Sequence, residues 1–224
     1  MTGRDVAVDP LADVGLRARK KQRTRAAIAK AATELFAEHG FAAVTVEQIA
    51  RTAGVARQTV FNYFDTKEEM LFDRDREVLT ALVTAVRERG SNTPPVEVFR
   101  AHTSAFWERI KAAAPGEAKP AGFWSVVESS PALRDHLEVV FARHARAVGI
   151  ELARERGLPD DDAPSHAIAR ALCAINSAIL TCGLGRIARG EDPAVVAEQM
   201  LADADGSYDL LEHGLIGRDG AQNG

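Results

Sequence analysis

The sequence predicts an all-α protein, and three observations support this fold class. Forty of the 224 residues are alanine, the residue with the highest helix propensity, whereas only 13 are aromatic. Apolar residues recur at helical spacing over most of the chain, and capping residues, glycines and prolines separate the periodic stretches. The alternation of apolar and polar residues that predicts strands does not occur over any useful length.

An arm and a first helix are expected at the N-terminal end. Residues 1–18 contain Gly, Pro and Asp without periodicity, so we expect a flexible arm there. From about residue 19 to residue 39 the apolar residues, among them Ile28 and Phe36, fall on one face of a helix. Gly40 then ends this helix.

Two short helices follow the first one. Thr45 and Gln48 fit a capping box at the start of a helix over 46–52. Gly54 can adopt the left-handed conformation that a tight turn requires, and a second short helix is expected over 57–64.

A second capping box over residues 66–69 opens a series of longer helices separated by Gly and Pro breaks. We expect these helices over residues 67–89, 96–113, 121–129, 131–156, 164–189 and 193–214. The predicted organisation is an arm over 1–18, a three-helix domain over 19–66, a second helical domain over 67–216 and a flexible tail over 217–224.

Charge is distributed unevenly along the chain. The net charge of −4 argues against a protein that coats nucleic acid over its whole surface. Residues 17–30, however, hold seven cations and no acid, and residues 1–70 hold 11 Lys and Arg against 9 Asp and Glu, while the remainder holds 17 against 23. This asymmetry favours an N-terminal domain that faces a polyanion, and the alternative is a solvated helix start.

Several classes of protein are excluded by what the sequence lacks. Two cysteines nine residues apart on one helix point to opposite sides, so neither a disulfide nor a shared metal is expected. Walker, dinucleotide-binding and nucleophile motifs are absent, so we expect no enzyme activity, no catalytic or metal site and no cofactor. Since neither a secretory signal nor a 20-residue apolar span is visible, we expect a cytoplasmic protein that does not bind membranes.

The segment from Thr45 to Phe64 has the layout of a helix-turn-helix: a short capped helix, a glycine turn and a second short helix. The basic stretch upstream and the polar run 57–59 favour DNA binding. A purely structural hairpin inside a helical bundle is the alternative.

These residues resemble the TetR family of transcriptional regulators over about residues 20–72. The matching elements, in order and spacing, are Thr24, Ala31-Ala32, Leu35 through Phe41, Thr45 through Ala50, Ala53-Gly54-Val55, Thr59 through Phe64, and Lys67-Glu68. The resemblance implies a homodimer whose recognition helices enter successive major grooves of a palindromic operator in double-stranded DNA. It also implies a repressor that a small, mostly apolar molecule releases from DNA. An activator, or a helical ligand-binding protein without sequence-specific DNA binding, remains the alternative.

Carried over residue by residue, the resemblance places Arg57, Gln58 and Phe61 at base-facing positions of the recognition helix. Arg57 suits guanine, Gln58 suits adenine and Phe61 suits a thymine methyl group. The family often has Gly at position 58 and Tyr at position 61, so Gln58 is expected to read sequence and Phe61 lacks a hydroxyl contact. The positions that match phosphate-contacting residues are Thr45, Thr59, Asn62, Tyr63 and Lys67. For Arg57 and Gln58 a solvated surface role, and for Phe61 partial burial, stay open.

The second domain is expected to bind the effector and to dimerise. Its aromatic residues concentrate in the middle of the chain, where a mostly apolar pocket with a few polar groups would suit a small molecule. The candidate ligand-binding residues are His102, Phe106, Trp107, Phe123, Trp124, Phe141 and Asn176. A plain aromatic core is the equal alternative.

Dimerisation is predicted from two apolar helices near the C-terminal end. The helix over 164–189 is apolar nearly all round, with Ile168 and Ile175 on one stripe, so it is expected to be buried on more than one side. The last helix carries a matching stripe from Ala197 to Leu215. Two such helices from each subunit would form a four-helix interface, whereas a single-chain core is the alternative.

Overall fold

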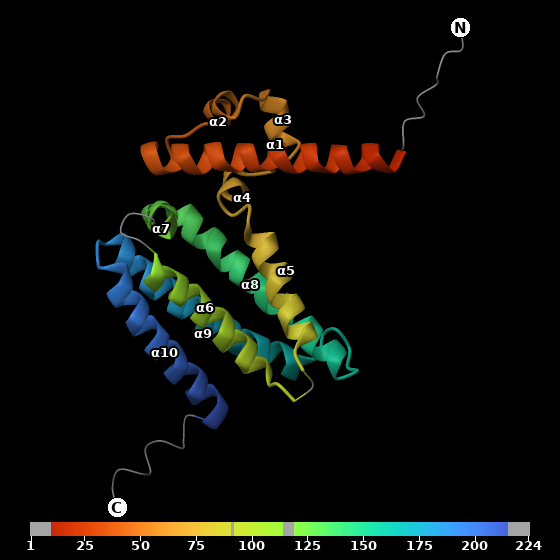
Figure 1. Cartoon of the computed structure of the whole chain (residues 1–224), viewed down its shortest axis with the longest axis vertical. Helices are drawn as coiled ribbons and strands as arrows, with labels where there is room; N and C mark the ends of the chain where they lie inside the picture. The colour runs from red at the N-terminus through yellow and green to blue at the C-terminus, as the bar shows by residue number, and fades with distance from the viewer. Residues whose placement is uncertain (1–9, 91, 114–118, 215–224) are drawn as a thin grey trace, which may run out of the picture. The chain divides into compact units, whose positions relative to one another are not determined.

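The computed structural model describes residues 10–90, 92–113 and 119–214 of the chain. Helices and their connections account for all of these residues, with no strand among them, which confirms the all-α class (Figure 1). The helices are α1 (Pro10–His39), α2 (Val46–Thr52), α3 (Arg57–Phe61), α4 (Lys67–Leu71), α5 (Asp75–Glu88), α6 (Pro95–Ala112), α7 (Lys119–Ser129), α8 (Pro131–Glu155), α9 (Ala163–Ala188) and α10 (Pro193–His213).

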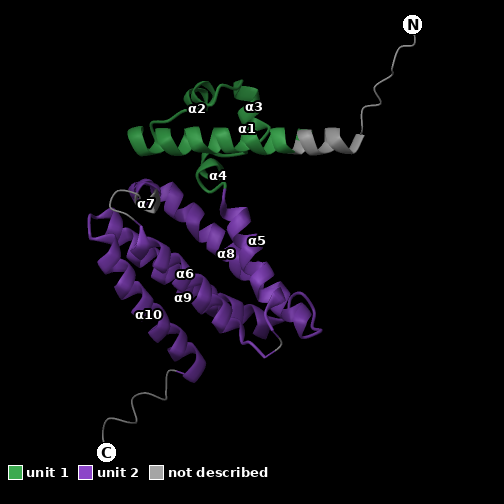
Figure 2. Cartoon of the chain, in the orientation of Figure 1, with its two compact units in different colours: residues 1–73 green, residues 74–224 purple. Residues whose placement is uncertain are grey.

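The chain forms two compact units that divide between Asp73 and Arg74 (Figure 2). The sequence placed the boundary between residues 66 and 67. The division lies later because α4 packs against α1 and so belongs to the first unit.

Unit 1 consists of α1 to α4 around one small core. The buried side chains that fill it are Ile28, Ala31, Ala32, Phe36, Phe41, Val44, Ile49, Ala50, Val60, Phe64, Met70 and Leu71. The predicted capping box at the start of α2 is confirmed: the Gln48 amide donates to the Thr45 hydroxyl, and the Thr45 amide donates to the Gln48 side chain. Gly54 has a φ of +67°, as the predicted turn requires.

Two predictions for this part of the chain are wrong. The expected arm is helical from Pro10 onward, while residues 1–9 lie outside the described residues. Pro is well accommodated in the first turn of a helix, and the run after it is rich in good helix formers, so no apolar periodicity is needed. The single helix expected over 67–89 is two helices, α4 and α5. The break between them contains neither Gly nor Pro; its last residue in unit 1, Asp73, is bound by Arg25 of α1 at 2.5 Å.

Unit 2 is built on α9, which packs against α6, α7, α8 and α10. By length and composition alone α9 could cross a bilayer, since its most apolar window has a mean hydropathy of 1.6. Its packing instead identifies it as the central helix of the unit. The residues of α9 that are buried are Ser165, Ala169, Leu172, Cys173, Asn176, Ile179, Gly183, Leu184, Gly185 and Ile187.

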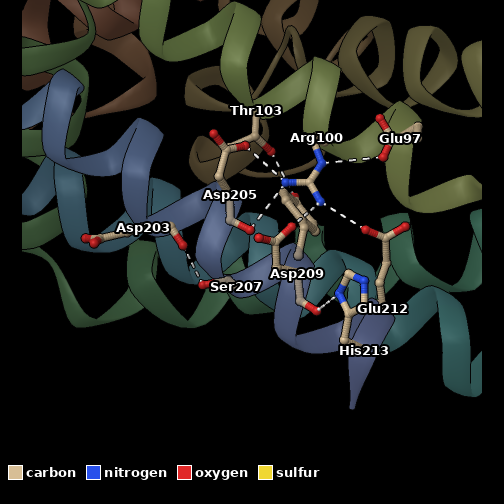
Figure 3. A network of polar contacts seen from close by, with 10 residues as sticks. Glu97, Arg100, Thr103, Asp203, Asp205, Ser207, Asp209, Glu212 and His213 are labelled. Carbon is tan, nitrogen blue, oxygen red and sulfur yellow. Dashed lines mark hydrogen bonds and ion pairs between the residues drawn. The ribbon is translucent and has the colours of Figure 1, made fainter. Parts of the chain in front are cut away.

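Polar contacts join α6 to its neighbours in unit 2. The buried Thr103 hydroxyl donates to the Asn176 amide oxygen at 2.9 Å and lies 2.9 Å from the Tyr208 hydroxyl. At the surface, Arg100 reaches the carboxylates of Asp209 and Glu212 at 3.0 and 3.1 Å, beside those of Glu97 and Asp205 (Figure 3). The side of α10 that faces α6 is therefore committed to the unit's own fold.

Candidate DNA-binding surface and effector cavity

Buried side chains on the inner face of each short helix hold the helix-turn-helix against the core of unit 1. Ile49 and Ala50 anchor α2 in the core, and Val60 and Phe64 anchor α3 and the residues after it. The Val55 amide donates to the Ala50 carbonyl across the glycine turn at 2.9 Å. With these four side chains turned inward, the opposite face of α3 is left to the solvent.

That outward face carries the residues predicted to read bases. Arg57 and Gln58 are exposed, and Phe61 keeps 40% of its surface accessible. The Arg57 guanidinium lies 5.1 Å from the centre of the Phe61 ring, and the Gln58 amide donates to the Asn62 side chain at 3.4 Å. Two neighbouring i, i+4 pairs therefore run along the exposed face of α3.

A contact that the sequence did not predict joins this face to α2. Arg57 Nε lies 2.6 Å from a carboxylate oxygen of Glu47, and both side chains are exposed. The two residues are ten positions apart in sequence and belong to different helices, so no helical spacing relates them. Only the packing of α2 against α3 brings them together.

The residues predicted to touch phosphate fall into two groups. Thr45 and Asn62 are exposed, whereas Thr59 and Tyr63 are half-buried. Lys67 is half-buried as well, and its ammonium donates to the carbonyls of Phe41 and Val44 at 2.9 and 2.8 Å. Its position is thus tied to the loop before α2.

Arg25, which the sequence placed in the basic stretch, also points into unit 1. Its guanidinium donates to the Tyr63 carbonyl at 2.6 Å, binds Asp73 and lies 4.1 Å from the centre of the Phe64 ring. This single side chain connects α1 with the residues that follow α3 and α4.

Unit 2 contains an open cavity of about 1020 Å³ between α8 and α9. It is lined by Glu138, Phe141, Ala142, Ala145, Arg146, Ile150, Asp160, Asp161, Ala163, His166, Ala167, Arg170, Cys173, Ala174 and Ser177. Five small alanines from facing helix surfaces leave room between the helices, and charged side chains of both signs surround it.

Of the seven predicted ligand-binding residues, only Phe141 lines this cavity. Trp107 and Trp124 are buried, and His102, Phe106 and Phe123 are half-buried. Asn176 is buried too and is bonded to Thr103. The Trp107 ring packs so closely on α9 that a methyl group built on Gly183 would lie 2.3 Å from it.

The comparisons with known proteins bear on both units. The model of the family described as "Bacterial regulatory proteins, tetR family" matches residues 28–73, which span most of unit 1. The chain is 31% identical over 155 residues to the HTH-type transcriptional regulator TcmR of Streptomyces glaucescens, covering 66% of this chain and 67% of TcmR. The chain belongs to the TetR family. It is accordingly a DNA-binding transcriptional regulator with a helix-turn-helix.

Two solved structures share this fold over most of the chain. FadR of Thermus thermophilus, a TetR-family repressor solved with lauroyl-CoA, is 24% identical with a TM-score of 0.53, and the match covers 89% of this chain and 99% of FadR. NalD, the secondary repressor of the MexAB-OprM multidrug efflux pump of Pseudomonas aeruginosa, is 22% identical with a TM-score of 0.52. That match covers 84% of this chain and 97% of NalD. At these identities the likeness concerns the fold.

Burial shifts the pKa values of two side chains in unit 2 of this TetR-family protein. Burial, together with the nearby Arg109 and His144, lowers the pKa of His102 below 6.5. Burial raises the pKa of the Cys173 thiol to about 12, so the thiol that lines the cavity stays neutral.

His144 of α8 is buried and lies 2.5 Å from Asp75 of α5, whose second oxygen binds Arg143 at 2.9 Å. No group of three or more His, Cys, Asp and Glu that could hold a metal occurs among the described residues.

The sequence did not predict the contact of Glu47 with the exposed face of α3, nor most of the residues that line the cavity. The cavity residues of α8 and α9 do carry a signal, because Ala142 and Ala145, like Ala163 and Ala167, recur at helical spacing. Stripes of small residues on two consecutive helices indicate either that the two helices pack closely together or that a cavity lies between them. Which of the two occurs depends on the tertiary packing.

Proposed function

We propose that this regulator is a homodimeric, ligand-responsive repressor that binds a palindromic operator in double-stranded DNA through α3. The observation that carries the proposal is the exposed face of α3, with Arg57 and Gln58 outward and Val60 anchoring the helix from behind. A helix presented in this way suits the major groove, where each base pair offers a distinct pattern of donors and acceptors. As a regulator of transcription, the protein would act in the cytoplasm, where bacterial DNA lies.

The proposed roles follow the side-chain chemistry. Arg57 would donate to guanine O6 and N7, Gln58 would pair with adenine, and the partly exposed Phe61 ring would pack on a thymine methyl group. Thr45, Thr59, Asn62, Tyr63 and Lys67 would contact phosphates and fix the position of the protein on the duplex. The Lys67 ammonium has three N–H donors, and two of them bind the carbonyls of Phe41 and Val44. The third would donate to the phosphate.

We place the effector in the cavity between α8 and α9. Its volume of about 1020 Å³ suits a small molecule, and Phe141, Ile150 and the alanines give it apolar walls. Arg146 and Arg170 could hold an anionic group at its rim.

The aromatic interior of unit 2 is the second candidate for the effector site. The observation that favours it is the indole N–H of Trp107, which is buried without a hydrogen-bond partner among the described residues. A buried donor of this kind is costly unless a ligand or water accepts from it. His102, Phe106, Phe123, Trp124 and Asn176 would then complete the site.

Helix α8 offers a route from the cavity to the rest of unit 2. One face of α8 lines the cavity through Glu138, Phe141 and Ala145, and another holds α5 through His144 and Asp75. An effector that displaces α8 would therefore displace α5, the first helix after unit 1. We propose that this displacement changes the separation of the two recognition helices in the dimer and so weakens operator binding.

The test of the proposed function is selection of bound duplexes from a random DNA library, followed by titration of the selected duplex and a scrambled one at stated salt. Tight binding to a palindrome is expected, and Arg57→Ala or Gln58→Ala should relax the preference at single positions. Binding without sequence preference would overturn the proposal and favour a helical ligand-binding protein. Because a repressor and an activator bind DNA alike, a reporter gene behind the selected site separates them, with lower expression expected here.

A further inference from the structure

The ion pair between Glu47 and Arg57 joins the two helices of the helix-turn-helix at the exposed reading face. Arg57 Nε lies 2.6 Å from Glu47 Oε1, and the two side chains keep 62% and 58% of their surface accessible. The same guanidinium lies 5.1 Å from the centre of the Phe61 ring. The guanidinium is therefore in contact with a carboxylate of α2 and with a ring of α3.

This ion pair is too exposed to matter much for folding. Solvent screens exposed ion pairs, and holding two long side chains in one arrangement costs conformational entropy, so such pairs contribute little to stability. Helix α2 has its own start signal in the Thr45 and Gln48 capping box. We therefore expect the ion pair to affect how Arg57 binds DNA more than it affects folding.

The guanidinium has donors to spare. It carries five N–H groups in a planar fork, and the contact with Glu47 is made through Nε. The terminal N–H groups are those that reach guanine O6 and N7 in the commonest specific contact to DNA. Arg57 can therefore remain bound to Glu47 while its far edge meets a base.

We infer that Glu47 is a positioning residue that makes Arg57 selective for its base. The inference rests on the proposed function, since it presupposes that Arg57 faces DNA. Glu47 holds the guanidinium in the direction of the base edge. When no guanine lies within reach, the ion pair with Glu47 also keeps the Arg57 guanidinium from binding the nearest phosphate.

The two effects act on different classes of DNA. On a duplex without the right base, an unrestrained arginine gains a phosphate contact and releases a counterion, which adds about 0.9 to the salt dependence of binding. With Glu47 present, a contact between Arg57 and phosphate competes with the ion pair between Arg57 and Glu47. The same contact also brings the phosphate close to the Glu47 carboxylate, and the two negative charges repel each other. Glu47 therefore weakens binding to unrelated DNA more than binding to the operator.

The experiment measures the ratio of affinities for the selected duplex and a scrambled duplex, over a series of salt concentrations. For Glu47→Gln we expect this ratio to fall about tenfold, mainly through tighter binding to scrambled DNA, and the scrambled-DNA salt slope to steepen by about one. Glu34→Gln is the matched control, because Glu34 is an exposed acid of unit 1 paired with Lys30 at 3.8 Å. Its ratio should equal that of the wild type.

A second pair of variants tests whether Glu47 acts through Arg57. In an Arg57→Ala background, Glu47→Gln should leave the ratio unchanged, because no guanidinium is left to position. A tenfold fall that persists in this background would show direct action of Glu47 on DNA and overturn the inference. Thermal unfolding of each variant shows that the fold is intact; a loss of discrimination that follows only a loss of stability also counts against it.

Failure of the inference is distinguishable from failure of the proposed function. If the wild type does not discriminate between the duplexes, the proposed function fails. If the wild type discriminates and Glu47→Gln discriminates equally well, with an unchanged salt slope, only the role of Glu47 is refuted.

Discussion

Lys67 shows how one residue can serve the fold where the family resemblance suggests a phosphate contact. Its ammonium donates to the Phe41 and Val44 carbonyls and lies 4.5 Å from the centre of the Phe41 ring. The loop before α2 is thereby fastened to the start of α4. Since a lysine ammonium has three donors, this structural role and a phosphate contact are compatible.

Replacing Lys67 should therefore destabilise the protein before any DNA is added. We expect Lys67→Met to lower the free energy of unfolding by about 1–3 kcal/mol, because two half-buried carbonyls lose a charged donor. Chemical denaturation in the absence of DNA measures this. Lys30→Met is the control, since Lys30 is exposed and pairs with the exposed Glu34, and it should change stability by less than about 0.5 kcal/mol. Equal stability of Lys67→Met and the wild type would contradict the structural role.

His102 should make stability depend on pH in a defined window. Its folded-state pKa is lowered from 6.5, first by burial and then by Arg109 and His144. The unfolded chain thus takes up a proton near pH 6.5 that the folded chain resists, so the free energy of unfolding should fall as the pH drops below 6.5. The carboxylates of Glu151 and Asp160, whose pKa values are lowered by Arg87 and Arg154, lose their contribution only at lower pH.

The measurement is denaturant unfolding between pH 7.5 and pH 5. His102→Gln should flatten the dependence over this range, whereas His213→Gln, which changes an exposed histidine of the same unit, should leave it as in the wild type. An unchanged slope for His102→Gln would show that the buried imidazole does not govern this part of the curve.

At the scale of helices, the sequence predicts elements wherever a local signal marks their ends. Pro occupies the first turn of α6, α8, α9 and α10, and each of these helices begins within a residue of its predicted start. The break between α4 and α5 lacks such a signal. It coincides with the division of the chain into units at Asp73, a property of the tertiary structure that periodicity does not contain.

Two glycines in unit 2 should respond in opposite directions to the same substitution. Gly183 of α9 faces the Trp107 ring and Met200, and an added methyl group would lie 2.3 Å from the ring and 2.6 Å from the Met200 side chain. Because Trp107 and Met200 are both buried, neither can move freely. Gly183→Ala should cost about 1–3 kcal/mol through overpacking.

Gly206 of α10 provides the contrast, since apart from the adjacent residues and backbone of α10 itself no atom of the described residues lies within 4 Å of a methyl group built there. Gly206→Ala should stabilise the protein by about 0.5–1 kcal/mol, because alanine loses less conformational freedom in a helix. Denaturant titration of both variants decides the matter. A Gly183→Ala protein as stable as the wild type would mean that α6 and α9 approach less closely than described.

For the molecule as a whole, the sequence predicted the exposed face of α3 better than it predicted the cavity. Because Val60 points into the core, helical spacing places Arg57 and Gln58 on the outer face of the helix. The local sequence was therefore enough to predict that these two side chains are exposed. A cavity is the space left where facing side chains are small, and it depends on both helices at once. Aromatic residues are common in a core and in a pocket alike, and the burial of Trp107 fits either one.

Burial within unit 2 limits which residues of α9 and α10 can form a dimer interface. On α10, Ala197, Met200, Ala204 and Tyr208 of the predicted stripe are buried within unit 2 and so are not available to a second subunit. On α9, the outward residues Ile168, Ala171, Ile175, Ala178 and Cys182 are exposed or half-buried. Their alternating spacing of three and four residues is that of a helix seam. We therefore propose that this stripe of α9 forms the centre of the homodimer interface.

Ile168→Arg tests the interface without disturbing the core, because 47% of the Ile168 surface is already accessible. In the dimer the new arginine of each subunit would be buried in an apolar contact without a partner charge, and this desolvation opposes association. Light scattering after size exclusion should show a shift from dimer to monomer. Val139→Arg is the matched control, since Val139 is an exposed valine of α8 and its replacement should leave the mass unchanged.

Loss of the dimer should carry over to DNA, because two linked reading heads bind a palindrome far more tightly than one. The monomeric variant should lose about 10²- to 10⁴-fold in affinity for the full palindrome while keeping its weak binding to a half-site. This pattern separates dissociation from damage to unit 1, which would reduce both. A variant that stays dimeric and binds the palindrome as the wild type does would place the interface elsewhere on unit 2, with the exposed Val195 near the start of α10 as the next position to change.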